Sequence, residues 1–123
     1  MKLTKTEEQL MELIWKHEKV FLKDILDSFP EPKPASTTIA TLLKRMQDKG
    51  FVAYELMGNS RQYYPLVKKT AYFSSHVKDL IKNYFNNSTS QFAAFFTTET
   101  NLTETELESL KKIIDQQIER KKK

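Results

Sequence analysis

The alternation of apolar and polar positions along the chain predicts a mainly helical protein with one small β-hairpin. Near the N-terminus, apolar residues recur at steps of three or four over residues 10–17. Thr4 and Glu7 stand at the spacing of a capping box, in which a hydroxyl and a carboxylate satisfy the free N–H groups of a first turn. A helix is therefore expected over residues 4–17, with Trp15 in the core.

The next segment predicts a short strand, a second helix and an extended connector. A short apolar run occupies residues 20–22, and apolar spacing then predicts a helix from residue 22 or 23 to Phe29. Proline lacks the N–H that a helix needs and biases the preceding residue toward extended geometry. Three prolines in alternate positions therefore predict a connector without helix, at Pro30, Pro32 and Pro34.

A third helix is expected to begin near Ser36, which is a good N-cap residue. Its apolar positions fall on one side and should be buried; they are Ile39, Leu42, Leu43 and Met46. Gly50 stands where a left-handed residue is wanted after the last turn of a helix. The helix should therefore end at residue 49.

A strand, a tight polar turn and a second strand follow this helix. The strands are expected over residues 51–57 and 62–67, with the turn at 58–61, and Pro65 marks an edge position or the end of the second strand. Three helices followed by a β-hairpin form a winged helix-turn-helix. We expect this domain to cover residues 1–69.

Residues 70–123 have a helical pattern but carry more apolar side chains than short separate helices can bury. Asn86, Asn87 and Ser88 interrupt the pattern, and Thr103 and Glu106 form a second capping-box signature before a last helix. Pairing of two copies would cover the apolar positions, since each buried Leu, Ile or Phe contributes roughly 1.5–3 kcal/mol. The segment is therefore expected to be a helical dimerisation domain, with contacts at Phe73, Val77, Leu80, Tyr84, Leu107, Leu110, Ile114 and Ile118.

The composition excludes several classes of protein. The chain has no cysteine, so disulfides and thiolate metal sites are excluded and the reducing cytoplasm is the expected compartment. No run of about 18 apolar residues exists, so no membrane insertion is expected. Only His17 and His76 are present, and no nucleotide-binding, hydrolase or metalloprotease motif occurs. We expect neither catalysis, nor a metal site, nor a cofactor.

Positive charge is concentrated in the third helix and the hairpin. Residues 33–69 carry 7 Lys and Arg against 2 acids, a net charge of +5. Residues 1–32 have a net charge of −2 and residues 70–123 a net charge of +1. An electrostatic contact with phosphates is therefore expected from this stretch.

The residue types in this stretch favour double-stranded DNA as the partner. Small hydroxyl residues at the start of a helix allow close approach to a major groove, where they contact base edges, and basic residues contact phosphates. The candidate DNA-binding residues are Lys33, Ser36, Thr37, Thr38, Thr41, Lys44, Arg45, Asn59, Ser60 and Arg61. Lys49 and Lys68 are further candidates for phosphate contacts, and Arg61 is expected to reach a phosphate or an adjacent minor groove.

Taken singly, Ser36 is a plain helix cap and the threonines are plain exposed residues. The alternative function is a winged-helix adaptor that binds protein and not DNA.

Three segments resemble the penicillinase-repressor family of winged-helix repressors (BlaI/MecI type). They are LTKTEEQLMELIW, VFLKDILDSFPEPKPASTTIATLLKRMQDKGFV and the hairpin end RQYYPLV. The resemblance covers the whole expected DNA-binding domain and, more loosely, the C-terminal helices. It implies a homodimer that binds a palindromic operator and represses transcription, with dimerisation after residue 70.

Two features of the family differ in this chain. Some members are inactivated when a membrane sensor-protease triggers cleavage of an Asn-Phe bond in the short C-terminal helix, which would imply indirect coupling to such a sensor. The matching pair here is Phe95-Phe96, so the asparagine is missing. Copper-responsive relatives carry a C-terminal cysteine motif, which a chain without cysteine lacks.

Overall fold

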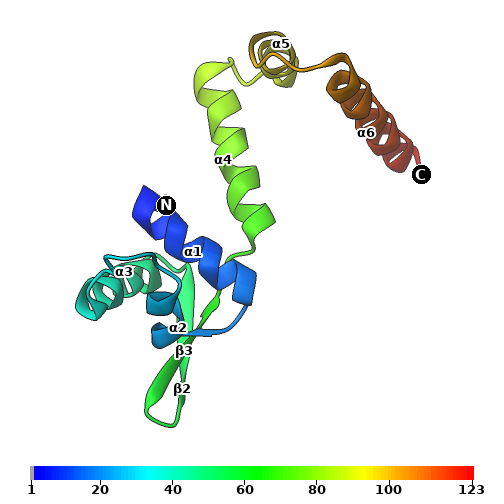
Figure 1. Cartoon of the computed structure of the whole chain (residues 1–123). Helices are drawn as coiled ribbons and strands as arrows, with labels where there is room; N and C mark the ends of the chain where they lie inside the picture. The colour runs from blue at the N-terminus through cyan, green and yellow to red at the C-terminus, as the bar shows by residue number, and fades with distance from the viewer. Residues whose placement is uncertain (1) are drawn as a thin grey trace. The chain divides into compact units, whose positions relative to one another are not determined.

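The computed structural model describes residues 2–123, and within them the chain is mainly helical with a small antiparallel sheet, as the sequence predicted (Figure 1). The elements in chain order are α1 (Lys5–His17), β1 (Val20–Phe21), α2 (Leu22–Asp27), α3 (Ser36–Asp48), β2 (Val52–Met57), β3 (Ser60–Pro65), α4 (Lys69–Tyr84), α5 (Thr89–Glu99) and α6 (Glu104–Lys122). The chain divides into two compact units, residues 1–74 and 75–123, which are described separately.

The predicted capping box at the start of α1 is confirmed. The Glu7 N–H donates to the Thr4 hydroxyl at 3.2 Å, and the Thr4 N–H donates to Glu7 Oε1 at 2.8 Å. The buried positions of α1 follow the helical period at Glu7, Leu10, Met11 and Ile14. These contacts fix the start of α1 and place a carboxylate inside the domain.

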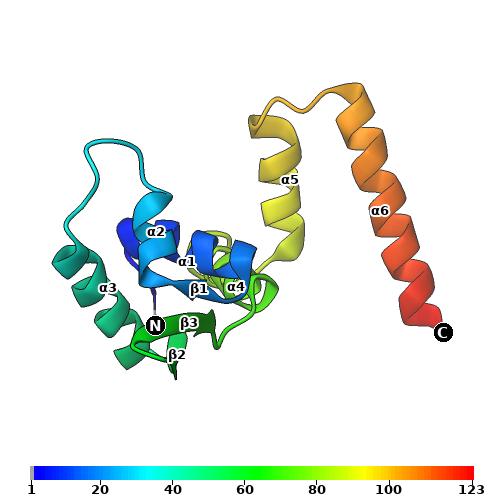
Figure 2. The same ribbon diagram turned by 60° about the horizontal axis from the view of Figure 1, so that its bottom comes forward.

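The second helix is shorter than the sequence predicted. It ends at Asp27 and not at Phe29, since Pro30 biases Phe29 toward extended geometry. The Ser28 hydroxyl donates to the Asp24 carbonyl at 2.8 Å, and the Ser28 N–H donates to the same carbonyl at 3.2 Å. Figure 2 shows the proline connector as an extended loop between α2 and α3.

The prediction that Ser36 caps the third helix is wrong by one residue. Ala35 is the N-cap residue, and its carbonyl accepts the first helical bonds from the Thr38 and Ile39 N–H groups. Ser36 is the first helical residue, so its hydroxyl stands on the helix surface. At the other end, Lys49 is the C-cap and Gly50 follows with φ of +83°, as predicted.

The hairpin has a tighter turn than the sequence predicted. Gly58 takes a φ of +66°, which lets two residues, Gly58 and Asn59, close the turn, so β3 begins at Ser60 and not at Gln62. The strand ends at Pro65, which is one of the two roles predicted for that proline and is two residues before the predicted end at residue 67. The short strand β1 is also confirmed, and it pairs with β3 to give the sheet order β1-β3-β2.

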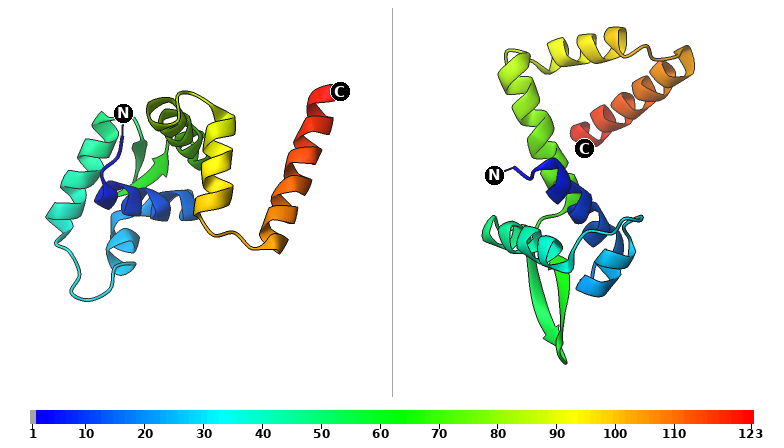
Figure 3. Two further views of the ribbon diagram at one scale, coloured as in Figure 1. Left: turned by 90° about the horizontal axis from the view of Figure 1, so that it is seen from above. Right: turned by 60° about the vertical axis from the view of Figure 1, so that its left-hand side comes forward.

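The core of residues 2–74 lies between the helices and one face of this sheet. Its buried members are Leu3, Leu10, Met11, Ile14, Val20, Ile25, Ile39, Leu43, Met46, Phe51, Val52, Tyr63 and Tyr72. Trp15 is half-buried against this core, and its indole N–H donates to the Val67 carbonyl at 2.8 Å. Beyond the core the hairpin continues past α3, as the right-hand view of Figure 3 shows.

Residues 75–123 form helices without an enclosed core. None of these residues is buried, although Phe85 packs against Phe92 and Phe95 with ring centroids 5.5 and 5.2 Å apart. The predicted break between helices is confirmed, because Asn86 and Asn87 both take positive φ and end α4. The capping box of Thr103 at the start of α6 is confirmed as well. No helix among the described residues is long and apolar enough to cross a membrane.

Candidate nucleic-acid interface

Helix α3 exposes one polar face whose position is fixed by the core. Thr37, Thr41 and Lys44 are spaced by four and three residues, so they form one row along the helix surface, and all three are exposed. On the opposite side Ile39 and Leu43 are buried. Because burial of that side sets the rotation of the helix, the polar row must face solvent.

The hydroxyl groups of this face are not equivalent. Thr41 Oγ1 donates to the Thr37 carbonyl at 2.9 Å, so its hydrogen is already used within the helix. Its oxygen can still accept a hydrogen bond, and its methyl group is exposed. Thr41 is therefore suited to an external donor or an apolar contact. Ser36 and Thr38 are exposed in the first turn.

The lysines of this region already have acidic neighbours. Lys44 Nζ lies 3.1 Å from Asp48 Oδ1, and Lys33 Nζ lies 3.5 Å from Asp27 Oδ1. Both pairs are exposed, and exposed pairs contribute little to stability, so a phosphate can compete for either lysine. Within the part of the chain that the structure describes, Arg45 has no ion-pair partner, and its guanidinium is exposed at the side of the polar row.

Lys49 is corrected from a candidate phosphate contact to a structural residue. Its Nζ lies 2.6 Å from Glu7 Oε1, and it also donates to the Lys2 carbonyl at 3.2 Å. Burial acts to raise the pKa of the Glu7 carboxyl, but the bonds from Lys49 and Thr4 outweigh it and lower that pKa below its usual value. The pair therefore joins the end of α3 to the start of α1.

The guanidinium of Arg61, in the hairpin, stacks on the ring of Tyr54 and does not extend outward from the turn. The Arg61 guanidinium carbon lies 4.4 Å from the centre of the Tyr54 ring, and Tyr54 packs against Tyr63 at 5.6 Å. The Tyr63 hydroxyl, followed by Tyr54, raises the pKa of Arg61 above its usual value, so the group stays charged. Asn59 and Ser60, at the turn itself, are exposed and uncharged.

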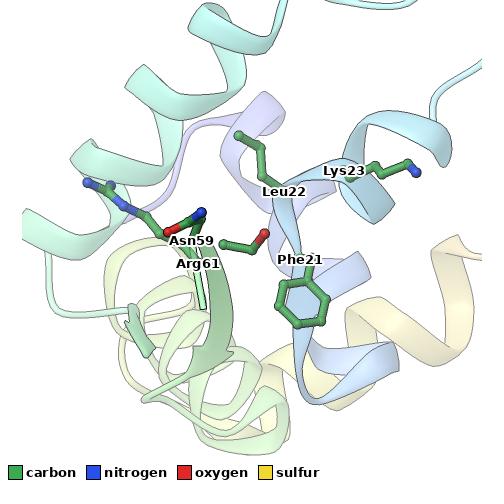
Figure 4. Close-up of a pocket in the computed structure, with 6 residues that line it drawn as sticks. Phe21, Leu22, Lys23, Asn59 and Arg61 are labelled. Atoms are coloured by element: carbon green, nitrogen blue, oxygen red, sulfur yellow. The ribbon is translucent and has the colours of Figure 1, made fainter. Parts of the chain in front are cut away.

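A groove of about 390 Å³ separates the turn of the hairpin from the start of α2 (Figure 4). It is lined by Phe21, Leu22, Lys23, Asn59, Ser60 and Arg61. Figure 4 shows the Arg61 side chain extending away from Phe21 and Leu22, on the opposite side of the hairpin. Lys23 was missed from the sequence, because it reaches this groove only through the pairing of Phe21 with Gln62, which joins distant segments.

The predicted dimerisation residues divide into two groups. Phe73 belongs to the unit of residues 1–74, where its ring centre lies 6.0 Å from that of Trp15 and 5.2 Å from that of Tyr72. The others lie in residues 75–123, and all are exposed except the half-buried Leu110: they are Val77, Leu80, Tyr84, Leu107, Leu110, Ile114 and Ile118. Leu110 lines a groove of about 290 Å³ with Phe96 and Leu102.

Comparisons with known proteins agree with this geometry. The family model of the penicillinase repressor matches residues 3–116. The methicillin resistance regulatory protein MecI of Staphylococcus aureus is 25% identical over 114 residues, which cover 92% of this chain and 93% of MecI. The penicillinase repressor of Bacillus licheniformis is 22% identical over 121 residues, covering 98% and 94%.

Two solved structures share the fold. The DNA-binding domain of the repressor BlaI has a TM-score of 0.51 and 24% identity, over 58% of this chain and 88% of that domain. The oxidised form of MarR from Escherichia coli has a TM-score of 0.50 and 14% identity, over 95% and 76%. The family that the three sequence segments resemble is thus confirmed, and the match extends beyond these segments to nearly the full length of the chain. By the match over residues 3–116, the chain belongs to the penicillinase repressor family.

Proposed function

We propose that the chain is a homodimeric repressor that binds a palindromic operator in double-stranded DNA through α3 and the hairpin of each copy. As a member of its family it is a transcriptional repressor and not an enzyme. The observation that carries the DNA contact is the exposed polar row of α3, held in place by the core behind it. We place its action in the cytoplasm.

In this proposal the first half of α3 enters a major groove. Ser36, Thr37 and Thr38 contact base edges or phosphates, while Thr41 accepts a hydrogen bond or packs its methyl group against a thymine methyl. Arg45 contacts a phosphate or a guanine edge further along the helix. Lys33, Lys44 and the hairpin residues Asn59, Ser60 and Arg61 contact the backbone, and Lys23 joins them across the groove beside the turn.

The domain division supports the proposal of a dimer. Residues 1–69 would bind DNA, and residues 70–123 would pair with a second copy. The support is the apolar surface of α4–α6, where Leu80, Ile113, Ile114 and Ile118 each expose more than two-fifths of their area. Full burial of an exposed Leu or Ile contributes roughly 1.5–3 kcal/mol, and each of these half-covered side chains would contribute a part of that, so several of them must be buried together to hold two copies. Two-fold symmetry would then place two half-sites about one helical turn apart.

The DNA contact is tested by a footprint on the region upstream of the gene. The protein should protect two half-sites, and the logarithm of the binding constant should fall linearly with that of the salt concentration. Arg45→Ala should weaken binding, because it removes an unpaired cation from the edge of the polar row. Arg120→Ala, which removes an arginine from α6, is the matched control. Failure to bind any such fragment at low salt, or binding without salt dependence, would contradict the proposal.

The dimer is tested by sedimentation equilibrium. Ile114→Asp places a charge in the exposed apolar row of α6 and should shift the mass toward that of a monomer. It should also weaken operator binding, because two linked half-site contacts raise each other's effective concentration. Gln116→Asp adds the same charge to the other side of α6 and should leave the mass unchanged. A monomer mass for the unaltered protein at every concentration would contradict the dimer.

Coupling to a membrane sensor-protease is a separate proposal, supported by the family resemblance alone. The pair Phe95-Phe96 lies in α5, and both side chains are exposed there. The intact mass of the protein, measured in cells before and after induction of its target genes, tests this. A fragment ending near residue 95 would support cleavage, and an unchanged mass with full induction would contradict it.

A further inference from the structure

The position of the Arg61 side chain is set by the register of the hairpin. Arg61 pairs with Leu56, whereas Tyr54 pairs with Tyr63, two residues further from the turn. The guanidinium carbon nevertheless lies 4.4 Å from the centre of the Tyr54 ring. The side chain is therefore directed back along the hairpin and away from its tip.

Strand alternation places this stack on one face of the hairpin. Side chains two residues apart in a strand share a face, so Arg61 stands on the same face as Tyr63. Tyr63 is buried in the core, on the side of the sheet that the helices cover. The Arg61 guanidinium is thus on the side where α3 lies. The tip consists of Gly58 and Asn59 between the paired Met57 and Ser60, and none of these residues is charged.

We propose that Tyr54 is a positioning residue that holds the Arg61 guanidinium as a clamp for one DNA backbone phosphate, so that Arg61 does not probe the minor groove from the tip. This inference rests on the proposed DNA binding and adds the way in which the hairpin contributes to it. The N–H groups of a stacked guanidinium lie at the edge of its plane. The Tyr63 hydroxyl takes up one part of that edge, and the remaining N–H groups can donate two parallel bonds to a phosphate.

Tyr54 would increase affinity by ordering Arg61 before DNA arrives. An unrestrained arginine loses side-chain freedom when it binds, at a cost that weakens affinity about 2- to 10-fold. A phosphate contact also carries no sequence information. Loss of Arg61 should therefore weaken binding to all DNA sequences by the same factor.

A double-mutant cycle on operator DNA tests the inference. Arg61→Ala should weaken binding about 10-fold and lower the salt slope by about one ion per copy. Tyr54→Leu should weaken binding about 3-fold in the natural background and have no effect when Arg61 is already alanine. Tyr54→Phe keeps the ring face and should bind like the unaltered protein. Tyr64→Leu, on the opposite face of the hairpin, is the control and should have no effect in either background.

A measurement on the free protein tests the stack between Arg61 and Tyr54 directly. It does not depend on whether the Tyr54→Leu variant folds. In the NMR spectrum of the unaltered protein, the ring of Tyr54 should shift the Arg61 δ-protons upfield, and Arg61→Ala should remove those signals. Random-coil shifts for these protons would overturn the inference.

Other outcomes separate the inference from the proposed function. Equal losses for Tyr54→Leu with and without Arg61 would overturn the positioning role while DNA binding stands. A loss for Arg61→Ala that is larger at A·T-rich than at G·C-rich flanks would show minor-groove contact and overturn the clamp. Absence of binding by the unaltered protein would overturn the proposed function and this inference together.

Discussion

Replacing either partner of the Glu7–Lys49 pair should destabilise the domain by different amounts. Only 1% of the Glu7 side chain is exposed, against 25% for Lys49, whose Nζ lies 2.6 Å away. The remaining carboxylate oxygen, Oε2, has no hydrogen-bond partner among the described residues. An unpaired charge is therefore far more costly on Glu7 than on Lys49, which can reach water.

Glu7→Gln removes the charge and keeps the capping box, because glutamine accepts the same bond from the Thr4 N–H. The bond from Lys49 is weakened because its acceptor is no longer charged, and we expect the free energy of unfolding to fall by about 1.5–3 kcal/mol. Lys49→Met leaves the buried carboxylate without its cation, and we expect a loss of about 3–5 kcal/mol. Replacing both residues by methionine should cost less than Lys49→Met alone, since no buried charge then remains.

The assay is urea unfolding followed by circular dichroism, with the same slope m required for each variant. The pH dependence gives a second readout with a fixed sign. Because the pKa of Glu7 is lowered in the folded protein, its contribution is present above the unfolded pKa and is lost as the pH falls through the folded value. Glu7→Gln should therefore be closer in stability to the unaltered protein in acid than at pH 7.

Two results would refute this reasoning. A smaller loss for Lys49→Met than for Glu7→Gln would mean that the carboxylate is solvated and that burial does not set the cost. An unchanged acid dependence in Glu7→Gln would mean that other groups carry the titration. Lys16→Met, which removes an exposed lysine from α1, is the control and should change stability by less than about 0.5 kcal/mol.

Three further predictions concern single groups in residues 2–74. Glu18 has a φ of +64° in a tight turn closed by the Lys19 N–H, so Glu18→Gly should raise the free energy of unfolding by about 1 kcal/mol; a lower value in urea would contradict the strain. Tyr72→Phe loses the 2.7 Å bond to Glu8 and should cost about 1–2 kcal/mol at neutral pH. Burial and then Glu8 raise the pKa of Tyr72 to about 12, so the stability of the unaltered protein should fall as the pH rises above about 10, and this part of the fall should vanish in Tyr72→Phe. Trp15→Phe loses the indole bond to the Val67 carbonyl and should cost about 1–2 kcal/mol, measured by circular dichroism; an unchanged midpoint would mean that water replaces the bond.

Local signals were enough to predict most of the fold. The capping box at Thr4, the positive φ at Gly50 and the break at Asn86 depend on neighbouring residues alone, and each is confirmed. The errors at Phe29, Ser36 and Gln62 are shifts of one or two residues at the ends of elements. Each of these ends lies close to a proline or a glycine. The backbone restriction of that residue, and not the apolar pattern, sets where the helix or strand begins or ends.

The candidate interface was less predictable, because long-range contacts decide which charges are available. Lys49 resembles its basic neighbours in sequence, and only its distance to Glu7, 42 residues earlier, identifies it as structural. Lys23 lies in a segment with a net negative charge, yet strand pairing brings it beside the turn of the hairpin. Neither contact leaves a periodic signal in the sequence.

The net charge of residues 33–69 therefore overstates the number of phosphates that this stretch can neutralise. Lys49 is held by the buried carboxylate of Glu7, and Lys69 has Glu12 as a partner at 3.1 Å. Lys33 and Lys44 must exchange an exposed carboxylate for a phosphate, which costs little because exposed ion pairs are weak. Of the seven cations in this stretch, five then remain for phosphates: Lys33, Lys44, Arg45, Arg61 and Lys68. So few phosphate contacts in each copy limit the affinity of a monomer, so pairing of two copies would strengthen operator binding and not only supply symmetry.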